Sequence, residues 1–72
     1  MNEKVMKKLA RITELVEEIK SDANYVKKSI KEIKESDDLY VIESTLESIE
    51  RQTKEARIVC LNTYDDFEED ES

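Results

Sequence analysis

The chain has 72 residues, 43% of them charged, and a net charge of −7. It contains no histidine, glycine or proline, and only one cysteine. It therefore lacks the usual residues for a general base, a structural zinc site, a phosphate-binding loop or an internal disulfide. We expect a single small domain that is not an enzyme and that holds no cofactor and no metal.

Apolar residues recur through the first half of the sequence at alternating steps of four and three. This period of 3.5 is typical of a helix that packs along its length against another helix. The first run consists of Val5, Leu9, Ile12, Val16, Ile19, Ala23, Val26, Ile30 and Ile33. A second run has the steps in reverse order and consists of Leu39, Ile42, Leu46, Ile49, Thr53, Ala56, Cys60, Thr63 and Phe67. We call the two runs together the heptad seam.

The mirrored steps predict an all-α fold, an antiparallel two-helix hairpin of the coiled-coil type. In this register Val5 faces Phe67, and the flanking Lys8 falls near Asp66. Most other flanking pairs agree in polarity or carry opposite charges: Met6 with Tyr64, Leu15 with Val59, Lys20 with Glu50, Asp22 with Gln52, Lys27 with Glu43, and Ser29 with Thr45. Thr13 beside Arg57 is neutral.

A polar segment over residues 34–38 separates the two runs and breaks the heptad phase, which argues against one continuous helix. Its residues Ser36, Asp37 and Asp38 all favour helix N-termini. We expect a hairpin over residues 1–64, with a helix over 2–35, a turn over 34–38 and a helix over 38–64. A three-helix alternative would break at residues 21–24, where helix propensity is weak, but the phase continues through them.

Several apolar residues lie off the seam, toward the open end of the hairpin: Met6, Leu15, Ile58, Val59, Leu61 and Tyr64. A two-helix hairpin buries little surface, so we expect these residues to form a docking face for a protein partner. The simplest partner is a second copy, giving a homodimeric four-helix bundle. Alternatively, these residues only widen the core or are scattered over the surface.

Negative charge is concentrated in the second half of the chain. Residues 1–38 carry nine basic and nine acidic side chains, whereas residues 39–72 carry three basic and ten acidic ones. We expect residues 65–72 to form a frayed or disordered acidic tail, with Asp65, Asp66, Glu68, Glu69, Asp70 and Glu71. The hairpin places this tail beside a basic patch of Lys4, Lys7, Lys8 and Arg11, which the tail can screen.

These features predict a non-catalytic interaction module that self-associates or docks onto a larger partner as a small regulator. The alternative is an acidic inhibitor of a basic or nucleic-acid-binding partner, through partial DNA mimicry by the second helix and the tail. We expect no direct nucleic-acid binding, because the body of the hairpin lacks a basic surface. Cys60, opposite Ile12 in the seam, is expected to be buried rather than reactive. No segment can span a bilayer, which predicts no membrane association and a cytoplasmic location.

Overall fold

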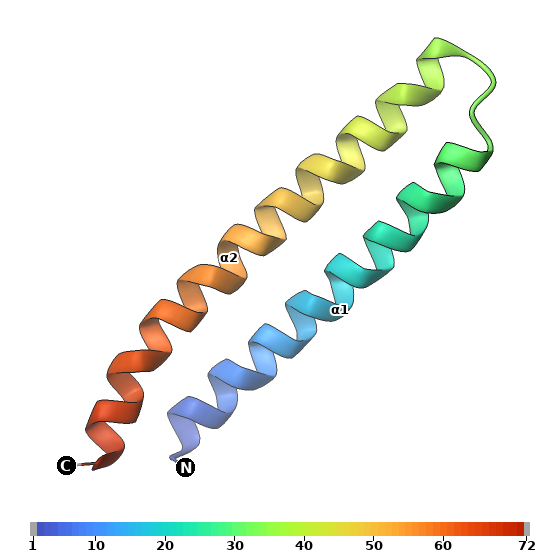
Figure 1. Ribbon diagram of the computed structural model, residues 1–72. Coiled ribbons are helices and arrows are strands. Elements are labelled where there is room, and N and C mark those ends of the chain that lie inside the picture. Colours follow the sequence, from blue (N-terminus) through green and yellow to red (C-terminus); the bar gives the residue numbers. More distant parts are fainter. Residues whose placement is uncertain (1, 72) are drawn as a thin grey trace.

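The computed structural model describes residues 2–71, with side chains through residue 68, and it forms a two-helix hairpin (Figure 1). Helix α1 spans Glu3–Lys31, a short 3₁₀ helix η1 spans Ser36–Asp38, and helix α2 spans Leu39–Glu71. The helices pack against each other and run antiparallel, so both chain ends lie at the end opposite the turn (Figure 1). The expectation of an all-α, two-helix hairpin is confirmed for the described part of the chain.

Asn2 begins α1 and also ties that helix to α2. Its side-chain Oδ1 accepts a hydrogen bond of 2.8 Å from the backbone N–H of Val5. Its Nδ2 donates to the backbone carbonyl of Asp66, in α2, at 3.0 Å. Asn2 therefore satisfies one of the unpaired donors of the first helical turn and fixes the open end of the hairpin.

Helix α1 ends at Lys31, four residues before the expected end, and the carboxylate of Asp38 explains why. It accepts hydrogen bonds from the backbone N–H groups of Lys34 at 2.8 Å and Glu35 at 3.1 Å. In a continuing helix these two groups would donate to carbonyls one turn earlier. Asp38, at the C-terminal end of the connection, thus satisfies two backbone N–H groups at its start. These two hydrogen bonds lower the pKa of the Asp38 carboxyl group.

Helix α2 continues beyond residue 64 and reaches Glu71. Asp66 lies in this extension with a buried side chain, and its Oδ2 is 2.6 Å from Nζ of Lys8. This contact holds the last turns of α2 against α1, in a segment that the sequence analysis assigns to a tail. Ser72 and the side chains of residues 69–71 lie outside the described residues.

The two helices contact each other through one flank of the heptad seam. The buried and half-buried positions that face the partner helix are Val5, Lys8, Ile12, Leu15, Ile19, Asp22, Val26 and Ser29 in α1. In η1 and α2 they are Asp38, Ile42, Thr45, Ile49, Gln52, Ala56, Val59, Thr63 and Asp66. Seam positions therefore alternate between inside and exposed, except that Ala23 is half-buried and Ile33 is exposed, and flanking residues take the vacated inside positions.

Contacts on the flank explain why each helix is rotated about its axis, away from a packing centred on the seam. Leu15 is only 1% exposed and supplies a large apolar side chain on that side. Gln52 Nε2 donates a hydrogen bond of 3.0 Å to Oδ2 of Asp22, and Arg11 Nη2 lies 2.8 Å from Oε1 of Glu55. Packing centred on the seam would expose Leu15 and separate these polar pairs. The expected neighbours Lys8–Asp66 and Asp22–Gln52 are confirmed. Of the seam pair Val5 and Phe67, Val5 is fully buried and Phe67 is 41% exposed.

Candidate functional site

The six residues predicted to form a docking face lie in three different places. Leu15 is buried between the helices and Val59 is half-buried there, so both already pack within the hairpin. Ile58 and Leu61 are 48% and 60% exposed, on the side of α2 that faces away from α1. Met6 and Tyr64 are 60% and 68% exposed near the open end.

A different set of large apolar side chains is exposed together on one side of the hairpin. These are the seam residues that the rotation leaves uncovered, and we call this surface the apolar face. It is formed by Leu9 (39% exposed), Val16 (51%) and Ile30 (57%) of α1, and by Leu39 (53%), Leu46 (50%) and Phe67 (41%) of α2. Cys60 is exposed on the same side of α2, so the expectation that it is buried is wrong.

A shallow hollow shows that both helices contribute to the apolar face. It has a volume of about 180 Å³ and is lined by Leu9, Ile12, Cys60, Thr63, Tyr64 and Phe67. Because Leu9 comes from α1 and Phe67 from α2, the hollow joins their exposed sides near the open end. A second hollow, of about 370 Å³, follows α2 beside Leu39 and Leu46 near the turn.

The two long edges of the apolar face carry opposite charges. Lys20 and Lys27 follow Val16 and Ala23 by one helical turn, and both are exposed. Glu43 and Glu50 follow Leu39 and Leu46 by the same step and are exposed as well. The edge along α1 is therefore basic and the edge along α2 is acidic over the middle of the hairpin. Among the ion pairs between described residues, none involves these four side chains.

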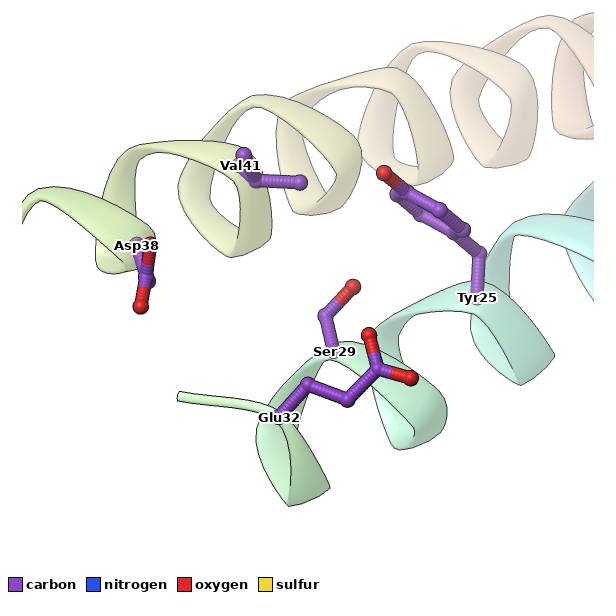
Figure 2. Close-up of a pocket in the computed structure, with 5 residues that line it drawn as sticks. All are labelled: Tyr25, Ser29, Glu32, Asp38 and Val41. Carbon is purple, nitrogen blue, oxygen red and sulfur yellow. The ribbon is translucent and has the colours of Figure 1, made fainter. Parts of the chain in front are cut away.

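The opposite side of the hairpin is polar and internally bonded, and we call it the polar flank. It holds the Lys8–Asp66 and Arg11–Glu55 ion pairs. The carboxylates of Glu55 and Glu14 raise the pKa of Arg11. Figure 2 shows the residues that line a hollow at the turn end of this flank, between α1 and the start of α2. The hollow has a volume of about 160 Å³. Its lining residues are Tyr25, Ser29, Glu32, Asp38 and Val41.

The basic patch near the N-terminus is engaged chiefly by carboxylates of the helices. Lys8 contacts Asp66, and Lys7 contacts Glu3 at 3.4 Å. Arg11 lies between Glu55 and Glu14, and Lys4 also makes an interaction. Of the predicted acidic tail, Asp66 reaches this patch, whereas Asp65 and Glu68 are exposed. Residues 69–71 continue the helix, and their side chains lie outside the described part.

Among the side chains that the structure describes, those of residues 2–68, no group of three or more histidine, cysteine, aspartate or glutamate residues is placed to hold a metal ion. No described helix combines the length and the apolar character needed to cross a bilayer. The arrangement offers surface chemistry: an apolar strip bordered by one basic and one acidic edge.

Comparison of the chain with protein-family models, with curated proteins and with solved structures finds no match.

The large seam residues of the apolar face were expected in the core, because the heptad pattern alone does not tell which side of each helix is inside. One signal could have corrected this expectation. Leu15 and Val59 are apolar on the flank, so the apolar stripe is wider than the two positions per heptad of a simple coiled coil. A stripe of three positions per heptad is typical of helices in larger bundles, which contact neighbours on two sides.

Proposed function

We propose that this protein is a non-catalytic helical hairpin that binds another protein through its apolar face. The observation that carries the proposal is the set of six large apolar side chains, each 39–57% exposed, on one side of both helices. A continuous apolar patch with polar borders is typical of a protein-binding surface. Each such side chain removed from water contributes on the order of 1 kcal/mol, because only part of its area is exposed.

The interior of the hairpin supports the same proposal. Only two hydrophobic side chains of the described residues, Val5 and Leu15, are fully buried. Such a small core contributes little stability to a chain of this size. A partner that covers the apolar face would bury these apolar side chains. Because such a partner binds only the folded state, it would also stabilise that state.

Site-specific photo-crosslinking tests this function. A photoreactive amino acid at position 46, on the apolar face, is expected to give covalent protein adducts in cells that express the chain. The same group at position 61 is the control, because Leu61 is comparably exposed but lies on the far side of α2. Equal adduct yields at both positions, or none at position 46, would contradict the proposal.

The alternative of an acidic inhibitor has a narrower basis. Glu43, Glu47 and Glu50 line the groove beside Leu46, which gives a basic partner three carboxylates and an apolar strip. However, Glu55 is already paired with Arg11, and Asp66 is paired with Lys8. A basic partner that recognises this chain as a mimic of nucleic acid would have to compete for these carboxylates, and the apolar face would remain uncovered. We therefore retain protein docking through the apolar face as the principal proposal.

A further inference from the structure

We infer that the partner on the apolar face is a second copy of this chain. Two hairpins stack face to face with α1 of each copy against α2 of the other, forming an antiparallel four-helix bundle. This inference rests on the proposed function, since it names the occupant of the same surface. It differs from the sequence-based expectation, which placed the contact around Ile58 and Leu61.

The size of the face suits a dimer of this kind. The hairpin is 58 Å long and 14 Å wide in the larger transverse direction. One side of it therefore covers about 800 Å², close to the area that each partner buries in an interface of standard size. A second hairpin has the same length and width, so it covers the whole strip from Leu9 and Phe67 at the open end to Leu39 at the turn.

The heptad pattern also favours packing of the hairpin against a second layer of helices. Within the hairpin, each helix uses the seam position exemplified by Ile12 and the flanking position exemplified by Leu15. The remaining seam position, exemplified by Val16, points to the apolar face and is 51% exposed. Four-helix bundles use all three positions, because each helix packs against two neighbours.

The charged edges select one of two possible orientations. Two-fold symmetry allows α1 to lie either on α1 of the second copy or on α2 of the second copy, and both arrangements are antiparallel. The first inverts the levels of the two copies and brings their basic edges together, with Lys20 of one copy near Lys20 of the other. The second brings this basic edge against the acidic edge formed by Glu43 and Glu50. Charge complementarity therefore favours the second orientation, whose two-fold axis runs parallel to the helices.

The levels of these residues along the hairpin fit this pairing. The hydrogen bond between Asp22 and Gln52 fixes the relative height of the two helices, and a two-fold axis parallel to them preserves that height. Along the helix axis, Lys20 then lies four residues, or about 6 Å, from the level of Glu50 of the second copy, an offset that a lysine side chain can span. Lys27 has the same relationship to Glu43 of the second copy. Arg57, farther along the acidic edge, falls opposite Thr13 and meets no charge.

Sedimentation equilibrium over about a hundredfold range of concentration tests the inference, with monomers of 8.5 kDa as the reference. The wild-type chain is expected to reach twice this mass. Substitution of both Val16→Glu and Leu46→Glu is expected to raise the dissociation constant by about 100-fold or more, because it places charges in the contact. Ile58→Glu with Leu61→Glu is the matched control, since these side chains are similarly exposed, and it is expected to leave the constant unchanged.

Charge-swap variants keep the test valid if the apolar-face variant fails to fold. Lys20→Glu with Lys27→Glu makes both edges acidic and is expected to weaken the dimer by about tenfold, through loss of four ion pairs and new repulsion. Adding Glu43→Lys and Glu50→Lys restores opposite edges and is expected to recover the wild-type constant. All four positions are exposed, so circular dichroism should show unchanged helix content.

The outcomes separate this inference from the proposed function. A wild-type chain that remains monomeric throughout would overturn the second copy as partner, and so would a dimer weakened only by the Ile58 and Leu61 substitutions. A dimer with equal constants for the half swap and the full swap would overturn the orientation. Crosslinking at position 46 tests the identity of the partner independently. Adducts of twice the chain mass support the inference. Adducts with other proteins alone would overturn it and leave the proposed function standing.

Discussion

The ammonium group of Lys8 lies 2.6 Å from the carboxylate of Asp66, and this pair joins the first turns of α1 to the last turns of α2. The Asp66 side chain is 8% exposed and the Lys8 side chain 36% exposed. A carboxylate this well covered needs a cationic partner, because the loss of its hydration is otherwise uncompensated. The pair therefore determines how firmly the open end of the hairpin is closed.

Removal of the Lys8 charge should destabilise the hairpin through Asp66. We expect Lys8→Met to lower the free energy of unfolding by about 1–2 kcal/mol, a value reduced for the partial exposure of Lys8. Lys7→Met is the control, because the Lys7–Glu3 pair is highly exposed and should contribute less than about 0.5 kcal/mol. Urea unfolding followed by circular dichroism measures both. Equal effects of the two substitutions would show that Asp66 does not depend on Lys8.

Leu15 should behave as a core residue even though it lies off the heptad seam. We expect Leu15→Ala to lower the free energy of unfolding by about 2–4 kcal/mol, because the side chain is fully buried and its removal leaves a cavity. Leu61→Ala removes the same atoms from an exposed position and should cost less than about 0.5 kcal/mol. Thermal unfolding of the two variants gives the comparison. A larger loss of unfolding free energy for Leu61→Ala than for Leu15→Ala would show that the side of α2 that carries Leu61 is the buried one.

The connection between the helices should weaken in acid because of Asp38. Hydrogen bonds from the backbone of Lys34 and Glu35 lower the pKa of this carboxyl group in the folded protein from its ordinary value of 3.8. A folded-state pKa below the unfolded one means that Asp38 stabilises the hairpin above about pH 4, and that this contribution is lost as the pH falls further.

Unfolding measured from neutral pH down to about pH 2 tests this linkage. Asp38→Asn should be less stable than the wild type at neutral pH, and the difference should shrink as the pH falls. Asp37→Asn is the control, because no hydrogen bond among the described residues involves the Asp37 carboxylate. If the difference in unfolding free energy between the wild type and Asp38→Asn stays constant with pH, the role of the carboxylate is refuted.

Cys60 should report on coverage of the apolar face. Its exposure predicts rapid reaction with a thiol reagent in the native protein at low concentration. A second hairpin on the apolar face would cover it, so the labelling rate per chain should fall as the protein concentration rises. Absorbance of the released thiolate follows the reaction at a fixed reagent concentration. Fast labelling that does not change with protein concentration would instead show that no second copy covers the thiol.

The sequence carried enough information to predict the hairpin and its register. Seam residues such as Ile12 and Ile49 indicated two helices, and the mirrored spacing indicated that they are antiparallel. The neighbours Lys8 and Asp66 followed from this register and are found in contact. Periodicity alone serves such predictions well, because it depends on the repeat distance of the helix and not on its rotation.

The rotation of each helix could not be predicted from the seam. Apolar residues occur on both sides of Ile12, with Val16 on one and Leu15 on the other, so two faces compete for burial. Polar contacts such as Asp22–Gln52 favour the side of Leu15, and these depend on side-chain geometry that spacing does not encode. The early end of α1 has the same origin, since it depends on two hydrogen bonds to one carboxylate.

The contrast between the polar flank and the apolar face has a consequence for the choice of solvent. A salt such as ammonium sulfate screens an exposed ion pair like Arg11–Glu55, and it also strengthens the association of apolar surfaces. The salt therefore weakens the charged contacts of the polar flank, and it strengthens the burial of apolar side chains both inside the hairpin and on its apolar face. A titration with this salt separates the charged from the apolar contribution to stability, two contributions that heat or urea would remove together.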